Sequence, residues 1–383
     1  MKKALIVFLC IIMAVTCSCS DTVDVETQAG ESLESNSEDT SPADDEEKPE
    51  EIVIPDSFNL QFDNSKKGIY NYCPSIMQIS DDTRYIYYCT NQVSYNVTDY
   101  IGCRKATLNS SGEWEWSEES IVLSPTKDTW DARHVCDPSV VGGSFKYNGE
   151  TYSYLMAYLG CTSSDNQENK IGLAVSKSPE GPFVKVGDAP LVDFQKDPSS
   201  SAFQWGVGQP SLVNMDKQGT VMMFYTRGDK TATRTIVEEW DLSDLSNPKR
   251  NSSVKLSENG LRTLNGTSDI LNNADFVYDS EAKRFYASSD CHPNPSDAPN
   301  FISSHFRIGY FEESSSYEYF VWKKLAQVGE DATGFARNHN TGILRDEYGH
   351  LPNGYITVYY TVSVTGNSSL WSYRIYDYNI KKK

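Results

Sequence analysis

The sequence predicts an all-β chain folded as a five-bladed β-propeller, and a long internal repeat is the main reason. The pattern X-Pro-Ser-apolar-apolar begins at Cys73, Asp137 and Gln209, and looser copies begin at Asn273 and Asn340. The copies are spaced by about 64, 72, 64 and 67 residues, which is enough chain for one four-stranded blade and its loops. Two β-sandwiches with similar turns are the alternative, but such a regular long period is hard to obtain from them.

Each copy of the pattern is followed by two further segments with the composition of strands. The second strand of each repeat is expected, in order, at Tyr85–Cys89, Tyr152–Tyr158, Val221–Tyr225, Arg284–Ala287 and Tyr355–Thr361. The third is expected at Tyr100–Leu108, Ile171–Ser176, Thr233–Leu242, Phe306–Phe311 and Leu370–Tyr378. Little chain remains after Ile380 for a fourth strand, so we expect the segment Ile52–Phe62 to complete the last blade and cover its edge.

The stretch from Trp130 to Val141 combines two acids, an Arg, a His and a Trp with a short apolar run. It is typical of a polar loop that leads into a strand. Because a residue before proline is restricted to extended geometry, we expect Asp137 to be extended and to be the first residue of that strand.

The N-terminal part of the chain predicts export and lipid attachment. Two lysines precede an apolar run that is too short to span a bilayer, followed by small residues and cysteines, so residues 1–18 are expected to be a lipoprotein signal peptide. Cys19 is the expected lipid-carrying residue, and Cys17 is the alternative. The protein would then be tethered outside the cytoplasm by its lipid rather than by a helix.

Residues 19–51 are expected to form a solvated linker, since they contain roughly 13 acidic residues against one lysine and almost no large apolar groups. Residues 52–383 would form one propeller domain, expected to be monomeric. The whole chain carries a formal charge of −19, and the domain about −9, which argues against nucleic acid as a partner.

The domain contains six cysteines: Cys73, Cys89, Cys103, Cys136, Cys161 and Cys291. An even number in an exported protein permits disulfides in any of 15 pairings, but a domain of this size does not need them, so free thiols are equally compatible. Zinc binding is weakly indicated, because there is no C-x-x-C motif and the histidines are scattered.

The first residues of the innermost strands are expected to surround one mouth of the central channel. These are Cys73, Asp137, Gln209, Asn273 and Asn340, and the same loops add Trp130, Asp131, Arg133, His134, Trp205, Asp275, Arg337 and His339. Carboxylates and amides bind paired hydroxyl groups and an indole stacks on a pyranose ring, so this set predicts a sugar site. Any one polar residue here could instead cap a strand.

The second repeat resembles a blade of the five-bladed propeller glycosidases, glycoside hydrolase families 43 and 32 and their relatives. The resemblance rests on Asp137–Val141, Tyr152–Leu159 and Ile171–Phe183, and extends less strongly over the repeats from about residue 60 onward. It implies a plant or microbial glycan with arabinose, xylose or fructose units as substrate.

Those families use an Asp in the first blade as base or nucleophile, an Asp in the second and a Glu in the third as acid. Asp137 matches the second position, but Cys73 and Gln209 occupy the other two, and neither can perform ordinary glycoside hydrolysis. A divergent hydrolase with relocated groups is one hypothesis, with Asp131, Asp137 and Asp275 as acids and His134 or His339 as proton donor.

The alternatives to a hydrolase are a carbohydrate-binding propeller that has lost the chemistry and a structural surface protein, because a fold alone does not determine function. No organic cofactor is expected. The resemblance also implies a calcium or sodium ion on the channel axis, for which His339 is the matching position, although no acidic calcium loop surrounds it.

Overall fold

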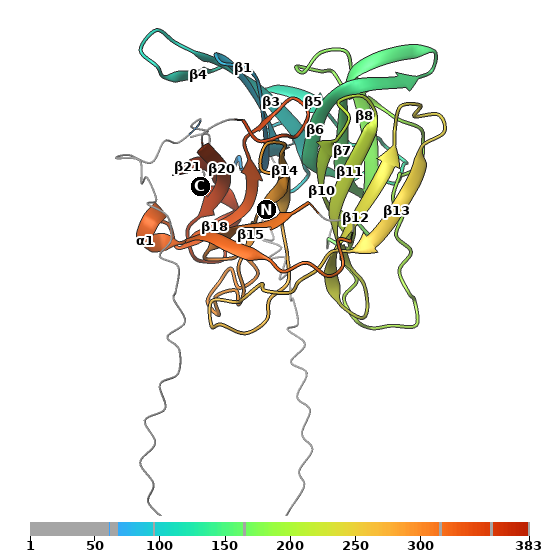
Figure 1. Cartoon of the computed structure of the whole chain (residues 1–383). Helices are drawn as coiled ribbons and strands as arrows, with labels where there is room; N and C mark the ends of the chain where they lie inside the picture. The colour runs from blue at the N-terminus through green and yellow to red at the C-terminus, as the bar shows by residue number, and fades with distance from the viewer. Residues whose placement is uncertain are drawn as a thin grey trace, which may run out of the picture. The chain divides into compact units, whose positions relative to one another are not determined.

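The computed structural model describes Gln61 and residues 68–381, apart from Tyr95 and residues 164–165, 314–315 and 353–354. The expected signal peptide, acidic linker and lipid-carrying Cys19 therefore lie outside the described residues. Within them, the chain is a five-bladed β-propeller, as the repeat predicts (Figure 1). None of the described helices is both long enough and apolar enough to cross a membrane.

Each blade is an antiparallel sheet whose first strand is innermost. Blade 1 contains β1 (Asn71–Ser80), β2 (Thr83–Thr90), β3 (Tyr100–Leu108), β4 (Trp114–Trp116) and β5 (Ser120–Leu123). Blade 2 contains β6 (His134–Tyr147), β7 (Glu150–Cys161), β8 (Lys170–Ser176) and β9 (Val184–Lys185). Blade 3 contains β10 (Gly206–Asn214), β11 (Thr220–Gly228), β12 (Thr233–Asp241) and β13 (Lys249–Lys255).

Blade 4 contains β14 (Asp275–Asp279), β15 (Arg284–Asp290), β16 (Phe306–Glu312) and β17 (Lys323–Val328), and is followed by the short helix α1 (Glu330–Thr333). Blade 5 contains β18 (Arg337–Ile343), β20 (Tyr355–Ser363) and β21 (Arg374–Lys381). The third strand of blade 5 was expected from Leu370, but a 3-10 turn, η1 (Ser369–Ser372), occupies its beginning.

Blades 5 and 1 lie side by side and close the circle. The short strand β19 (Arg345–Asp346), which follows β18, pairs in parallel with β1. On the outer side of blade 5, the backbone N–H of Gln61 donates to the carbonyl of Ile375 in β21 at 3.2 Å. This contact agrees with the expected N-terminal closure, although the neighbouring residues 51–60 and 62–67 lie outside the described residues.

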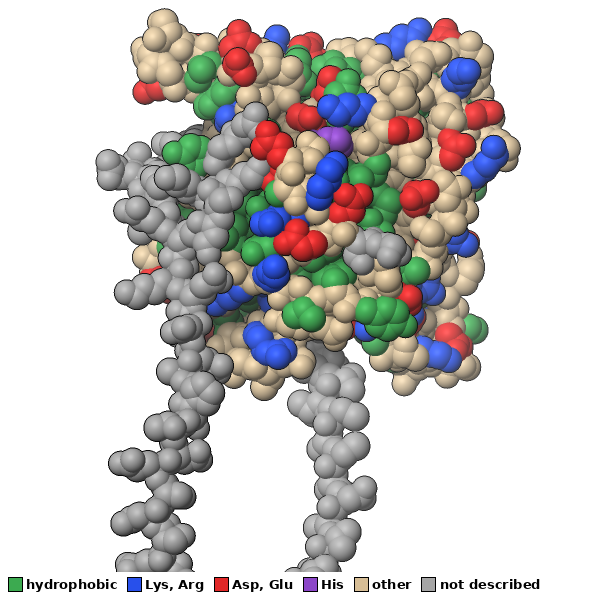
Figure 2. Space-filling view, in the orientation of Figure 1, with side chains coloured by type: hydrophobic (Ala, Val, Ile, Leu, Met, Phe, Trp, Pro, Cys, Tyr) green, Lys and Arg blue, Asp and Glu red, His purple; other side chains and the backbone are tan. Residues whose placement is uncertain are grey.

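The hydrophobic core includes five clusters that each lie between two neighbouring blades, and two smaller clusters besides. Phe224 of blade 3, for example, stacks on Phe276 of blade 4 with ring centroids 4.0 Å apart. Corresponding clusters join blades 1 and 2, 2 and 3, 4 and 5, and 5 and 1. The apolar faces of all five sheets are therefore covered, whereas the face in Figure 2 shows acidic and basic side chains interspersed without a large patch of either sign.

Candidate functional site: the channel mouth

Five residues, one from each blade, form a ring around one mouth of the channel: Cys73, Asp137, Gln209, Asn273 and Asn340. Together with the residues that follow them, they line a small cavity of about 40 Å³. The sequence therefore predicts the composition of this ring correctly. We call these five residues the mouth ring.

The backbone geometry of the mouth ring differs from the expectation. All five residues have positive φ, from 46° to 53°, so Asp137 is left-handed rather than extended. Asp137 is also not the first residue of its strand, since β6 begins at His134. The physical reason is a β-bulge: in blades 1, 2, 3 and 5 the strand register shifts across the ring residue and the next residue.

A β-bulge turns a side chain away from the regular pleat, which here turns each ring side chain toward the mouth. Left-handed geometry costs about 1–3 kcal/mol for a residue other than glycine, least for Asn and Asp. Cys73 and Gln209 have no such tolerance, yet they adopt the same φ as Asn273 and Asn340. Repeated strain at one cavity is typical of a functional site.

Hydrogen bonds link the ring residues across neighbouring blades. The backbone N–H of Gln209 donates to the Asp137 carboxylate, and the backbone N–H of Asn273 donates to Oε1 of Gln209 at 3.2 Å. The Gln209 amide also donates to Oδ1 of Asn273. The ring is thus a connected polar network that holds its side chains in place.

Asp137 is the acidic member of the mouth ring. Burial raises its pKa to about 6, while hydrogen bonds from the Cys73 thiol and the Gln209 backbone oppose that rise, and the negative charge of Asp99 adds to it. Its backbone N–H donates to the sulfur of Cys89 at 3.1 Å. No lysine or arginine among the described residues forms an ion pair with its carboxylate.

A second acid, Asp290 at the end of β15, lies behind the ring and was not predicted. Its Oδ2 accepts a hydrogen bond from the Asn273 amide at 2.6 Å, and its Oδ1 accepts one from the backbone N–H of Asn340 at 3.0 Å. Burial raises its pKa to about 7, although these hydrogen bonds and the nearby His292 and Arg307 side chains act in the opposite direction. The ring is therefore associated with two buried carboxyl groups that titrate near neutrality.

The other predicted acids are held by partners elsewhere in the fold. Asp275 lines the cavity, but its carboxylate is paired with the buried Arg345 and accepts a hydrogen bond from Ser211 at 2.7 Å. Asp131 does not line the cavity and is paired with Lys185 at 2.5 Å. Both groups stabilise packing between strands, so neither is free for proton transfer.

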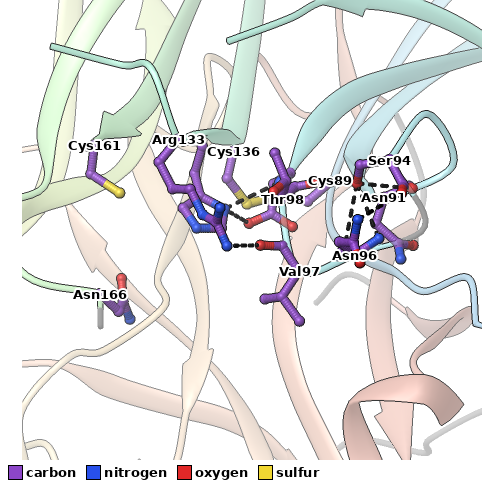
Figure 3. A network of polar contacts seen from close by, with 12 residues as sticks. Cys89, Asn91, Ser94, Asn96, Val97, Thr98, Arg133, Cys136, Cys161 and Asn166 are labelled. Atoms are coloured by element: carbon purple, nitrogen blue, oxygen red, sulfur yellow. Dashed lines mark hydrogen bonds and ion pairs between the residues drawn. A yellow bond between two sulfur atoms is a disulfide. The ribbon is translucent and has the colours of Figure 1, made fainter. Parts of the chain in front are cut away.

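Several other predicted residues also support loops. His134 contacts Asp99 at 2.8 Å. Arg133 donates to the carbonyl of Val97 at 3.0 Å, and Figure 3 shows the Arg133 side chain pointing toward Val97. Trp130 stacks on Tyr158 with ring centroids 5.7 Å apart. Arg337 is buried and paired with Asp297 at 3.0 Å. None of these predicted residues lines the cavity.

Trp205 is the predicted aromatic residue that lies near the mouth. It does not line the cavity, but it packs against the small cluster of Cys89, Cys136 and Leu159. A side chain on Gly208, the residue before Gln209, would collide with its indole, so the indole lies directly over the backbone that leads into the ring.

The surroundings of His339 do not fit the calcium or sodium ion that the resemblance implies. Its imidazole is fully buried, its Nδ1 contacts Oδ1 of Asn340, and its Nε2 has no partner. Burial lowers its pKa to about 4, and the nearby charge that acts on it is the cation Arg337, which opposes a second cation. No acidic side chain is involved, although hard cations require oxygen ligands.

Two cysteines close a disulfide at the mouth, and four described cysteines are free. The bond joins Cys89 at the end of β2 to Cys136, the residue before Asp137. Cys73, Cys103, Cys161 and Cys291 remain as thiols. Sequence alone left 15 complete pairings and free thiols open; the structure has one bond, which joins blades 1 and 2, and four free thiols among the described residues.

A signal for Asp290 was present in the sequence. The polar run Ser288–His292 follows an aromatic strand that was expected to end at Ala287, whereas β15 continues to Asp290. The strands β14 and β15 are antiparallel neighbours, so the end of β15 lies beside the start of β14. An acid at the end of β15 therefore lies next to the mouth ring.

Comparison with known proteins shows similarity in structure only. No protein-family model matches the chain, and no curated protein matches it in sequence. A family 117 glycoside hydrolase from the marine bacterium Zobellia galactanivorans superposes with a TM-score of 0.53 at 12% identity, covering 85% of this chain and 89% of that one. A thermostable family 43 glycoside hydrolase superposes with a TM-score of 0.50 at 16% identity, covering 84% and 92%.

An exo-β-1,3-galactanase from Phanerochaete chrysosporium superposes with a TM-score of 0.51 at 15% identity, and there the match covers 81% of this chain and 60% of that one. The chain thus has the fold of the five-bladed propeller glycosidases. At these identities the similarity establishes the fold, while the chemistry has to be argued from the residues at the mouth.

Proposed function

We propose that the protein is a glycoside hydrolase that cleaves O-glycosidic bonds at the channel mouth. One observation carries this proposal: two buried carboxyl groups, Asp137 and Asp290, belong to one hydrogen-bonded network around the cavity and have pKa values of about 6 and about 7. Glycoside hydrolysis requires two carboxyl groups in different protonation states. The structural similarity to glycoside hydrolases supports this choice of reaction.

Asp290 has the properties of the general acid in this proposal. With a pKa of about 7 it keeps a substantial protonated fraction at neutral pH, so it can give a proton to the leaving oxygen. Asn273 and the Asn340 backbone hold both of its oxygens and fix its orientation. The Asp290 carboxyl group would reach a substrate in the cavity between Asn273 of blade 4 and Asn340 of blade 5.

Asp137 would be the second carboxyl group. With a pKa of about 6 it is mostly ionised at neutral pH, and the donors from Cys73 and Gln209 stabilise the charged form. Its charge would stabilise the cationic character that develops on the sugar ring in the transition state. The two positions that Cys73 and Gln209 occupy therefore support a neighbouring carboxylate instead of reacting themselves.

The amides of Gln209, Asn273 and Asn340 would bind hydroxyl groups, and Trp205 would contact the apolar face of a sugar. Arabinose, xylose, fructose or galactose units of plant or microbial glycans are the substrates to test first, and galactose is included because a galactanase shares the fold.

A screen of residues 52–383 against arabinan, xylan, fructan and galactan oligosaccharides tests the proposal, with product release and binding measured on the same samples. We expect release from at least one glycan and its loss in Asp290→Asn. Binding without release from any of them would replace the hydrolase with a carbohydrate-binding propeller.

The proposal includes a location outside the cytoplasm, attached through a lipid on Cys19, which rests on the apolar run and small residues at the N-terminus. Cys19→Ala is expected to move the protein from the membrane fraction to the soluble fraction. Retention of Cys19→Ala together with release of Cys17→Ala would assign the lipid to Cys17, and retention of both would refute lipid attachment.

A further inference from the structure

Three sulfur atoms and one carboxylate oxygen lie together at the mouth. The Sγ atoms of Cys73, Cys89 and Cys136 and an oxygen of Asp137 are all within 4.8 Å of one another. Oδ1 of Asp137 is 3.3 Å from Sγ of Cys136 and 3.9 Å from Sγ of Cys89. The four groups come from two blades, so the sequence spacing gives no sign of this cluster.

The size of the cluster matches a tetrahedral metal site. Zinc binds thiolates at about 2.3 Å and carboxylate oxygens at about 2.0–2.2 Å, which places neighbouring ligand atoms less than about 4 Å apart. Three sulfurs and one oxygen form a donor set suited to zinc rather than to calcium or magnesium. Cys89 and Cys136 are buried, so water would compete weakly there.

The disulfide is what prevents this set from binding a metal, because its two sulfurs carry no negative charge. We infer that reduction of the Cys89–Cys136 bond converts the cluster into a site for zinc or a similar thiophilic divalent cation, with Cys73, Cys89, Cys136 and Asp137 as ligands. The inference goes beyond the proposed hydrolysis and does not require it to be correct.

The chemistry balances with an external reductant such as a dithiol or a phosphine. A phosphine gives two electrons to the disulfide and leaves as its oxide with an oxygen from water, while the two protons of that water complete the thiols of Cys89 and Cys136. The cation then displaces the protons of three thiols and coordinates the ionised Asp137. The uncharged Tyr72 hydroxyl also lies close, 3.1 Å from Sγ of Cys136.

A metal in this site would also engage the carboxylate of Asp137. If the proposed hydrolysis is correct, the oxidised protein is the active form and the reduced, zinc-loaded form is inactive. The two ideas can fail separately, since metal binding has a spectroscopic signal that is independent of turnover.

Cobalt titration of the full chain after reduction by a phosphine tests the inference. We expect one equivalent of Co²⁺ to give the visible absorption of tetrahedral, thiolate-bound cobalt, and one equivalent of Zn²⁺ to displace it. The oxidised protein should give no such absorption. Cys73→Ser should weaken binding by more than about 100-fold, because it removes a ligand directly.

Cys103→Ser is the matched control, since Cys103 is a buried free thiol of blade 1 outside the cluster. It should bind cobalt like the parent protein. Equal binding by Cys73→Ser, or no tetrahedral cobalt absorption from the folded, reduced parent protein, would refute the site.

Reduction could unfold the chain, and the site makes a prediction for that case as well. Zinc added to the reduced chain should restore the circular dichroism of the β-sheets, because ligand binding favours the folded state. Failure of zinc to restore it would equally overturn the inference.

Discussion

The buried acids of this propeller fall into two groups that differ in whether a basic side chain forms an ion pair with the carboxylate. Asp269 is buried beside His292 and Arg307, which hold its pKa at about 2 even though burial alone would raise it. Asp290 follows 21 residues later and is also buried, but its direct partners are neutral amides, and its pKa is about 7. Two buried carboxyl groups thus have pKa values shifted in opposite directions, because one has a basic partner and the other has neutral partners.

The same contrast separates Asp131 from Asp137, six residues apart in the sequence. Asp131 is paired with Lys185 and accepts from Thr129 and Tyr158, which is the arrangement of a group that stabilises the fold. Asp137 receives donors from Cys73 and Gln209 without a cation. Asp137 and Asp290 form no ion pair among the described residues, and both belong to the hydrogen-bonded network of the mouth ring, which makes them the candidates for chemistry. Asp377 also has a raised pKa, about 6, but it lies in β21, the outer strand of blade 5.

The largest expected effect distinguishes these two neighbours. Asp137→Asn keeps the shape of the side chain but removes its charge, so it should lower turnover by roughly 10²-fold or more. Asp131→Asn should keep turnover per folded molecule and instead lower the free energy of unfolding by about 3 kcal/mol, because Lys185 loses its partner. Kinetics and denaturant unfolding of both variants measure this, and a reversed pattern would exchange their roles.

The next effect concerns the ion pair behind the mouth. Arg345→Met should lower the free energy of unfolding by about 3–5 kcal/mol, because it leaves the Asp275 carboxylate buried without its cation. Lys177→Met is the control: its pair with Glu150 is exposed to solvent, so the change in the free energy of unfolding should be much smaller. Similar losses in both variants would show that Asp275 is not held as described.

A pH series tests the acids without a substrate. The raised pKa of Asp290 means that the native state binds an extra proton, so its contribution favours folding below about pH 4 and is lost as the pH rises toward 7. The full change is about 4 kcal/mol at most. Asp290→Asn should therefore gain stability relative to the parent protein between pH 4 and pH 8.

Asp269→Asn should behave in the opposite way. The lowered pKa of Asp269 contributes stability above pH 4 that is lost as the pH falls toward 2. The loss of stability of Asp269→Asn relative to the parent protein should therefore be largest at neutral pH. Urea unfolding at several pH values measures both. Parallel curves for the parent protein and Asp290→Asn would contradict the raised pKa.

The smallest effect sharpens the role of Cys73. Its thiol stabilises the ionised Asp137, so Cys73→Ala should raise the pKa of Asp137 and move the acid limb of the activity profile to higher pH. Turnover at the optimum should change by less than about tenfold. A folded but inactive Cys73→Ala would show that Cys73 itself takes part in the reaction.

The repeat in the sequence was sufficient to predict the propeller and the members of the mouth ring, because one residue per repeat must reach the axis. It was not sufficient to predict how those residues are held. Proline after Asp137 favours extended geometry locally, but the bulge pairing with β7 requires left-handed geometry there. Tertiary pairing therefore outweighs the local preference.

Asp290 and the cysteine cluster were missed for a related reason. Both depend on which strand ends meet in space, and single residues such as Cys89 carry no periodic signal for that. Conversely, Trp130 and Arg133 were selected because they are close to Asp137 in the chain, whereas their side chains contact Tyr158 and Val97. Proximity in sequence was a poor guide at a site assembled from five blades.

The pH dependence of kcat/KM on a cleaved glycan, measured for the parent protein and for Asp290→Asn, tests the central claim most directly. We predict a bell-shaped profile with its maximum between about pH 6 and pH 7, because Asp137 must be ionised and Asp290 protonated. Asp290→Asn should have low activity, and its profile should lack the fall at alkaline pH, because that fall reports the loss of the Asp290 proton. An unchanged bell in Asp290→Asn would contradict the assignment of Asp290 as the acid.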